Sequence, residues 1–267
     1  QREGAGMGAN GSPPPLEVRA ADLSVSDELI HWTCPVINDP TATSLNHAYL
    51  QGLCSIYRDK DEHGNYIIYI PKEREAILER IPYLRKSARL FTRFDNDGKR
   101  IDVPKIEVVI DSKLLDHNSR DFVPNHHSLK SKLEWFAGLY DSFYQGPTSG
   151  YTILDFLNAE PEFTVRVKEM LQTCGVHAIC NRDENTIYLT YHDCIALQYL
   201  GFNPVMLLPI YDGTTVRETF RKRIYKIVHA GRHDDTYCFT ELKRHMGVFN
   251  GMITGQCSEI IQYSDAK

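Results

Sequence analysis

The sequence of 267 residues lacks several features that would assign it to a class at once. It has no apolar run of about 18 residues, the length that a membrane-spanning helix needs. No basic segment followed by an apolar stretch opens the chain, so no secretory signal is predicted. The seven cysteines include no Cys-x-x-Cys pair, and their odd number and irregular spacing are typical of neither a disulfide framework nor a zinc site. We therefore expect an intracellular protein in a reducing compartment, with no membrane partner.

A strong excess of positive charge is also missing, because 30 Lys/Arg stand against 35 Asp/Glu and the net charge is −5. This balance argues against a wholly basic nucleic-acid-binding protein, but charge can be local. Residues 72–105 and 216–226 are rich in Lys/Arg, and the first segment also holds aromatic side chains. Two interpretations stay open for these basic segments: a solvated helix face, or a surface that contacts phosphates. The second interpretation predicts nucleic-acid contacts by Arg85, Lys86, Arg89, Arg93, Lys99 and Arg100.

The first 15 residues are rich in Gly and Pro and predict a disordered tail. They contain "GAGMGA", but no strand precedes it and "PPP" follows, so the context of a phosphate-binding loop is missing. Residues 16–36 favour short strands around a polar turn.

From residue 43 onward, the apolar pattern alternates between helices and strands. Helices are expected at 43–59 with Ser44 as N-cap, at 73–90 with a break at Pro82, and at 128–144, 161–175 and 193–202. Strands are expected at 65–70, 90–95, 105–111, 176–181 and 186–191. This order predicts an α+β fold with an internal repeat.

One helix pattern occurs twice, as "YLQGLCSIY" at 49–57 and as "WFAGLYDSF" at 135–143. Tyr49 corresponds to Trp135, and Gly52 corresponds to Gly138. A glycine inside a helix costs about 1 kcal/mol relative to alanine, so it usually has a packing reason. We predict that the two helices cross so closely that only glycine fits at the contact.

These residues resemble the motif of the LAGLIDADG homing endonucleases, and "FAGLYDSFY" follows it almost residue for residue. The resemblance covers roughly residues 44–205 and implies an endonuclease-like domain at 41–208. It implies a pseudo-twofold αββαββα fold in which the two motif helices pack together and saddle-shaped sheets bind double-stranded DNA. In that family each motif helix delivers one carboxylate to shared Mg²⁺ ions.

The motif's metal-binding acid is its eighth residue, and here Tyr57 and Phe143 take its place. Neither ring is a suitable ligand for a hard cation that binds oxygen. Asp59 and Asp141 lie two residues away, which is about 200° around a helix. We expect that DNA cleavage is lost and that Mg²⁺ matters only if cleavage survives. A functional endonuclease or DNA-binding protein is the alternative.

Near the end, "DTYCFTELKRHMGVFNGMITGQC" at 235–257 resembles the C-terminal splicing blocks of inteins. The resemblance implies a Hint-type β-fold, with strands expected at 224–230, 235–241 and 248–254. The side-chain amide of Gln256 would cyclise, and Cys257 would be the downstream nucleophile. His245 would transfer protons, Cys238 would tune the branch step, and Gly255 stands where a histidine is usual. No cofactor is expected for splicing.

The last residues, "CSEIIQYSDAK" at 257–267, resemble an active-site strand of class I ribonucleotide reductase large subunits. By that resemblance Cys257 would be the radical cysteine and Glu259 its neighbouring carboxylate, in an extein segment. Residues 16–40 resemble the end of an N-terminal Hint half and 209–256 the C-terminal half. An N-terminal intein half is therefore an expected partner.

A further hypothesis is a metal-dependent hydrolase built on "DHNSRDFVPNHH" at 116–127. His126 and His127 are adjacent, so they cannot share one helical face. A solvated loop explains this segment better.

Overall fold

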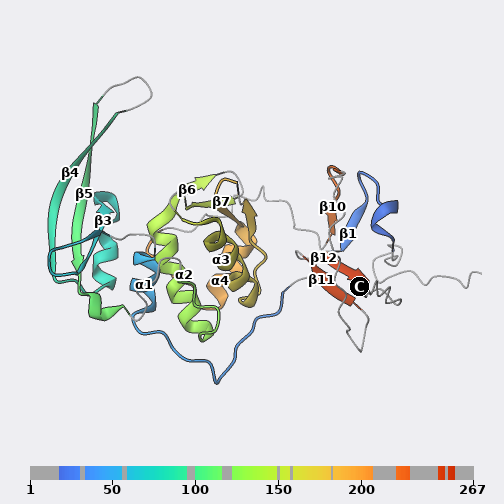
Figure 1. The fold of residues 1–267 in the computed structure, drawn as a ribbon, viewed down its shortest axis with the longest axis horizontal. Coiled ribbons are helices and arrows are strands. Elements are labelled where there is room, and N and C mark those ends of the chain that lie inside the picture. Colours follow the sequence, from blue (N-terminus) through green and yellow to red (C-terminus); the bar gives the residue numbers. More distant parts are fainter. Residues whose placement is uncertain are drawn as a thin grey trace, which may run out of the picture. The chain divides into compact units, whose positions relative to one another are not determined.

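The computed structural model describes residues 18–30, 34–55, 59–94, 100–115, 122–148, 151–156, 159–181, 183–206, 221–228, 246–249 and 252–255. The chain divides into two compact units, Cys34–Thr215 and the combined segments Gln1–Thr33 and Val216–Lys267. None of the helices in the described part of the chain is both long and apolar enough to cross a membrane. Figure 1 shows the elements of each unit.

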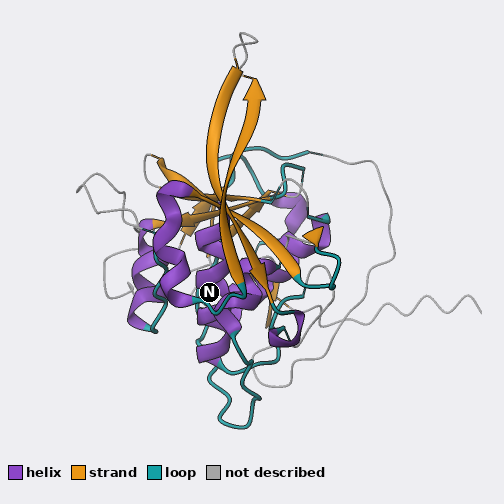
Figure 2. Ribbon diagram, turned by 90° about the vertical axis from the view of Figure 1, so that its left-hand side faces the viewer, coloured by secondary structure: helices purple, strands orange, loops and turns teal. Residues whose placement is uncertain are grey.

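The first half of unit Cys34–Thr215 begins with a helix and continues into an antiparallel sheet. Its elements are α1 (Ala48–Cys54), β2 (Asp59–Lys60), β3 (Tyr66–Pro71), the 3₁₀ helix η2 (Lys72–Arg80), β4 (Arg85–Phe94), β5 (Arg100–Ile110) and the short η3 (Ser112–Leu114). The strand order is β2-β3-β5-β4. Strand β3 pairs with β5 only from Lys105 to Ile110, so the outer parts of β4 and β5 continue as a two-stranded ribbon (Figure 2).

The second half repeats this arrangement. Its elements are α2 (Leu129–Phe143), β6 (Tyr144–Thr148), β7 (Tyr151–Asp155), α3 (Pro161–Thr173), β8 (Ile179–Asn181), β9 (Thr186–Thr190) and α4 (Tyr191–Tyr199). The strand order β6-β7-β9-β8 is the order of the first sheet, and in both halves a helix separates the second strand from the third. The predicted α+β fold with an internal repeat is confirmed for this unit.

The predicted helix at 73–90 is wrong in its second part. The 3₁₀ helix ends at Arg80, Ile81 is extended, and residues 85–94 form strand β4. Pro82 explains the end, because the residue before a proline is sterically pushed out of the helical region. Pairing of all of β4 with β5 then overrides the helix propensity of "RKSARL".

Other boundaries shift by less. Helix α1 begins at Ala48, and His47 rather than the predicted Ser44 takes the N-cap position. Helix α3 ends before Gly175, whose φ of +81° suits a residue without a Cβ and agrees with the predicted stop. Strands β6 and β7 were not predicted, because Gly146 and Pro147 in the first of them are typical of a loop.

The core of this unit lies between the helices and the inner faces of both sheets. In the first sheet, burial alternates along β3, and Ile68 faces inward as a pair with Val108 of β5. In β5 every residue from Ile106 to Ile110 is buried. In the second half, Trp135, Phe136 and Tyr140 of α2 are fully buried. One continuous cluster of buried apolar residues therefore joins the two repeats.

The other unit combines chain from both sides of Cys34–Thr215. The 3₁₀ helix η1 (Ala20–Asp22) and β1 (Glu28–Ile30) come from the N-terminal side, and β10 (Arg221–Arg223), β11 (Met246–Phe249) and β12 (Met252–Gly255) come from the C-terminal side. Strand β1 pairs with β10, and β11 pairs with β12. The single strand predicted at 248–254 instead covers parts of two paired strands, β11 and β12. Residues 224–228 of the strand predicted at 224–230 form no strand and follow β10, and the strand predicted at 235–241 lies outside the described residues.

Candidate functional site

The two motif helices cross at their glycines. A Cβ on Gly52 would lie 1.8 Å from the carbonyl oxygen of Trp135, and a Cβ on Gly138 would lie 1.9 Å from the carbonyl oxygen of Tyr49. Real Cβ atoms do not approach other heavy atoms so closely. Only glycine is compatible with this crossing, as the spacing of the repeat predicted.

The crossing is also symmetric. Each glycine faces the carbonyl group of the residue three positions before the other glycine. Each also faces the amide nitrogen of the leucine directly after the other glycine: Gly52 faces that of Leu139, and Gly138 faces that of Leu53. The same residues of each repeat therefore make the same contact with the other repeat. This reciprocity is what a pseudo-twofold axis between α1 and α2 requires.

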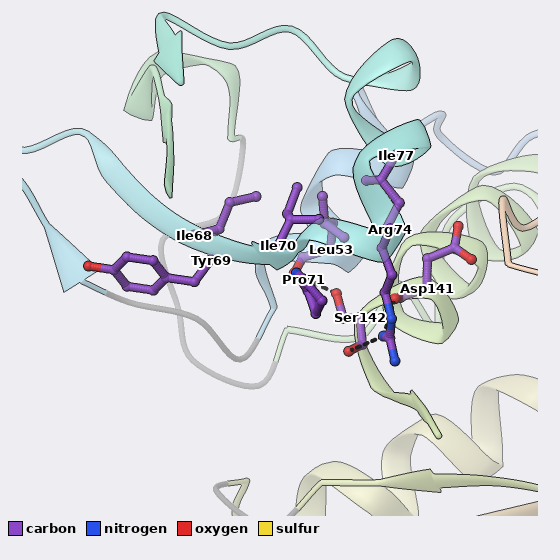
Figure 3. A pocket seen from close by; sticks show the side chains of 9 residues that line it. All are labelled: Leu53, Ile68, Tyr69, Ile70, Pro71, Arg74, Ile77, Asp141 and Ser142. Carbon is purple, nitrogen blue, oxygen red and sulfur yellow. Dashed lines mark hydrogen bonds between the residues drawn. The ribbon is translucent and has the colours of Figure 1, made fainter. Parts of the chain in front are cut away.

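The carboxyl ends of the two helices are joined by polar side chains (Figure 3). The Ser142 hydroxyl of α2 donates to the carbonyl oxygen of Leu53 in α1, at 3.0 Å. The Arg74 guanidinium of η2 donates to the carbonyl oxygens of Asp141 and Ser142, at 2.9 and 3.1 Å. Helix carboxyl ends carry partial negative charge and unpaired carbonyl groups, so the arginine satisfies both.

Arg74 also lines a small pocket at this helix end. Its walls come from α1, β3, η2 and α2, and its lining residues are Leu53, Ile68, Tyr69, Ile70, Pro71, Arg74, Ile77, Asp141 and Ser142. In Figure 3 the Arg74 side chain reaches from η2 to the end of α2. The sequence did not indicate that Arg74 lies at the end of α2, because residues 73–90 were predicted to form one longer amphipathic helix.

Asp141 is fully buried and holds the chain that follows α4. Its carboxylate accepts hydrogen bonds from the Tyr49 hydroxyl at 2.5 Å and from the backbone N–H groups of Val205 and Met206 at 2.7 and 2.8 Å. Burial raises the pKa of Asp141, and these three donors oppose that rise. The carboxylate is thus engaged by protein groups, and its role is structural.

The position of the motif acid in α2 is occupied by Phe143, whose ring packs edge-on against Phe156 with centroids 5.3 Å apart. Tyr57, the corresponding residue of the first repeat, lies outside the described residues. Within the described ranges no group of three or more His, Cys, Asp and Glu side chains is arranged to hold a metal ion. The described residues at the helix ends therefore do not fit a Mg²⁺ ion.

The outer face of the first sheet, opposite the core, carries cations and aromatic rings. The strand register places Arg85, Arg89 and Lys105 on this face, together with Tyr69 and Phe91. The two rings meet edge-on at 4.9 Å, and the Lys105 Nζ lies 4.9 Å from the Phe91 centroid. We call these five residues the basic face.

One carboxylate interrupts the basic face. Glu107 accepts from the Arg89 Nε at 2.8 Å and from its Nη2 at 3.2 Å. This paired hydrogen bond holds the pKa of Glu107 below its ordinary value. The Arg89 side chain nevertheless stays 56% exposed, so it can still contact a ligand.

The other predicted cations lie elsewhere. Lys86 points to the opposite side of the sheet, where its Nζ is 3.3 Å from Glu75 of η2. Arg100 pairs with Asp102 at 3.0 Å near the end of the ribbon. Lys99 and the side chain of Arg93 lie outside the described part. Sequence reasoning missed Tyr69, and it included Lys105 in the basic segment 72–105 but not among the predicted contacts. Alternation along β3 and β5 was the available signal.

Of the predicted splicing residues, only Gly255 is described. It ends β12 and pairs with Met246 of β11. Cys238, His245, Gln256, Cys257 and Glu259 lie outside the described residues. Their roles stay predictions.

No family model matches the chain. The chain is similar to a ribonucleoside-diphosphate reductase large subunit from Invertebrate iridescent virus 6. The two are 60% identical over 286 aligned residues, which include 93% of this chain and 27% of that protein. The chain thus spans about a quarter of the length of the curated relative that it matches.

Among solved structures, the chain is similar to the homing endonuclease I-WcaI bound to its DNA recognition sequence. The TM-score is 0.39 and the sequence identity is 14%, over 59% of this chain and 82% of that one.

Proposed function

We propose that the chain is the C-terminal part of an intein within a ribonucleotide reductase large subunit. In this proposal it joins a splicing segment to an endonuclease-like domain that binds DNA without cutting it. The observation that carries the proposal is the extent of the similarity to the viral reductase. The predicted extein segment, 257–267, is far too short to account for a match over 93% of the chain. The match therefore includes most of the predicted intein, so the viral relative carries counterparts of it.

The arrangement of the units supports the same proposal. Segments before and after Cys34–Thr215 form one unit, in which Glu28 pairs with Arg223 across nearly two hundred residues of sequence. Such pairing is expected when one domain is inserted into a loop of another, because insertion leaves the ends of the host domain close together. An endonuclease-like domain inside a splicing domain has this topology.

The proposed chemistry takes place directly after the β11–β12 hairpin. The ladder of β11 and β12 includes the pair Met246–Gly255. In the sequence His245 precedes Met246 and Gln256 follows Gly255; both lie outside the described residues, and the proposal expects their side chains to lie close together. In the proposed step the side-chain amide nitrogen of Gln256 attacks its own backbone carbonyl carbon. A six-membered imide forms, the bond to Cys257 breaks, and the released α-amine of Cys257 takes up a proton. A nearby imidazole would deliver that proton.

Mass spectrometry tests this step. The chain is incubated with a separately produced N-terminal Hint half, and the masses are followed over time. We expect the appearance of residues 1–256 or of a spliced product, and from Gln256→Ala neither release of residues 1–256 nor a spliced product. Cys257→Ala should prevent splicing but still allow cleavage after Gln256. Survival of the 256–257 bond under added thiol would contradict the splicing proposal.

The DNA-binding part of the proposal rests on the first sheet. Its basic face combines exposed arginines with aromatic rings, and β4 and β5 extend as a ribbon of the kind that the major groove accommodates. Binding through phosphates does not need the missing motif acids. Because Phe143 offers no oxygen ligand, we expect no cleavage with Mg²⁺.

Two assays on the full chain test this part. Fluorescence anisotropy with a labelled random-sequence duplex at low salt should show binding that weakens as salt rises. Plasmid incubated with Mg²⁺ should stay supercoiled. Nicking at a defined position would favour the alternative, a functional endonuclease, and lack of any binding at low salt would refute the DNA-binding role.

A further inference from the structure

The two sheets of the repeat have the same strand order but very different charge. The strands of the first sheet contain seven Lys/Arg and three Asp/Glu: Lys60, Arg85, Lys86, Arg89, Arg93, Arg100 and Lys105 against Asp59, Asp102 and Glu107. The strands of the second sheet contain neither lysine nor arginine, and their single acid is Asp155. The fold is pseudo-symmetric, but the charge of its sheets is not.

In the described residues, the outer face of the second sheet carries apolar and uncharged polar side chains and one acid, Asp155. Strand pairing places Ile179, Tyr188 and Ile153 side by side on this face, and Ile179 is 47% exposed. Glu184 lies in the turn between β8 and β9, and its carboxylate accepts a hydrogen bond from the Tyr188 hydroxyl at 3.1 Å. Arg182 of the same turn lies outside the described residues.

A phosphate backbone would meet opposite conditions on the two faces. On the first sheet, each cation that contacts a phosphate releases condensed counterions and so favours binding. On the second sheet, an exposed isoleucine offers a phosphate no donor, and Glu184 and Asp155 repel it. The phosphates of a duplex laid over the second sheet would therefore lose their bound water without gaining hydrogen bonds or ion pairs in return.

We propose that DNA recognition by this chain is one-sided: the first sheet contacts the duplex and the second sheet does not. This inference rests on the proposed DNA-binding function. The ligand is then a single half-site of duplex, held by β4, β5 and the cations of the basic face. The salt dependence should correspond to only about three to five phosphate contacts, a slope of roughly −3 to −4.5 on logarithmic axes.

Two equivalent positions allow a matched test. Ser87 lies on the outer face of β4, and Ile179 lies on the outer face of β8; both strands are the fourth in their sheet's order, and both residues are exposed. Each position is changed to lysine and to glutamate in the full chain. Comparing lysine with glutamate at one position isolates charge, because both variants lose the same native side chain.

Dissociation constants for a labelled duplex are measured near 0.1 M salt, with melting curves to verify folding. One phosphate contact changes affinity by roughly tenfold at this salt concentration. We expect Ser87→Lys to bind at least about tenfold more tightly than Ser87→Glu, and Ile179→Lys and Ile179→Glu to agree within about twofold.

Each other outcome has a distinct meaning. A large difference at both positions would overturn one-sided recognition but leave DNA binding intact. Binding without a difference at either position would place the interface elsewhere and also overturn the inference. A chain that binds no duplex at low salt would remove the DNA-binding function itself.

Discussion

The carbonyl oxygen of Tyr49 lies 1.9 Å from the point where Gly138 would carry a Cβ. The reciprocal contact of Gly52 with the carbonyl oxygen of Trp135 is 1.8 Å. The obstacle at each position is backbone, which cannot rotate away as a side chain can. The packing of α1 against α2 therefore requires that neither Gly52 nor Gly138 carries a Cβ atom.

Gly138→Ala should destabilise unit Cys34–Thr215 by at least about 3 kcal/mol, the upper end of ordinary overpacking costs, because α1 and α2 must separate. Urea denaturation followed by circular dichroism measures the change. Gly64→Asn is the matched control, since Gly64 has a positive φ but no atom within 4 Å of its would-be Cβ. Equal stability of the Gly138→Ala variant and the natural chain would contradict the crossing.

Arg74→Met should also destabilise this unit, because it removes the charged donor from the carbonyl oxygens of Asp141 and Ser142 while keeping the stem. We expect a loss of about 1.5–3 kcal/mol in the free energy of unfolding. Arg74→Lys keeps the charge without the forked geometry and should recover only part of the loss. Equal free energies of unfolding for the Arg74→Met variant and the natural chain would contradict a stabilising role of Arg74 at the end of α2.

Asp141→Asn should cost about 2–4 kcal/mol, because a buried amide cannot accept equally from Tyr49 and two backbone N–H groups. Thermal unfolding measures this loss. Asp39→Asn is the control, since Asp39 lies in an exposed loop and its carboxylate accepts from the N–H and the hydroxyl of Thr41, two residues further on. A loss no greater than that of the control would rule out the anchoring role.

Asp141 should also contribute to the pH dependence of stability. Burial raises its pKa above the ordinary value of 3.8, so in the window between the two values the native protein binds more protons than the unfolded chain. Stability from this group therefore falls as pH rises through that window and is constant above the native pKa. The difference in unfolding free energy between the natural chain and Asp141→Asn, measured from pH 4 to 8, should show this slope.

Glu107→Gln should strengthen DNA binding several-fold, because it removes the carboxylate from the basic face and frees Arg89. Its cost in stability should be about 1–2 kcal/mol, because the Glu107 side chain is only 9% exposed but its amide replacement can still accept from Arg89. Glu75→Gln also removes a carboxylate beside a cation, Lys86, but on the opposite side of the sheet. Equal effects of both substitutions on the dissociation constant would argue against the basic face as the contact surface.

Much of the fold was accessible from the sequence, because the relevant signals are local. The repeated aromatic–apolar–Gly–Leu string predicted the crossing at Gly52 and Gly138, and Gly175 predicted the end of α3. The errors have a common cause. Residues 85–90 have helix-forming composition, yet pairing with β5 makes them a strand. Whether such a segment forms a helix or a strand depends on a pairing strand far along the sequence, and this pairing leaves no pattern in the segment itself.

The sequence by itself determined where the helices must cross, since a glycine inside a helix has a cost that only close packing offsets. It also determined that the motif acids are absent, because a side chain's ligand atoms follow from its identity. Only the tertiary structure decided which cations share a face, that Asp141 anchors the chain after α4, and that Arg74 closes the helix ends. Those relations join residues distant in sequence, and they arise only when the two sheets and the two helices have packed.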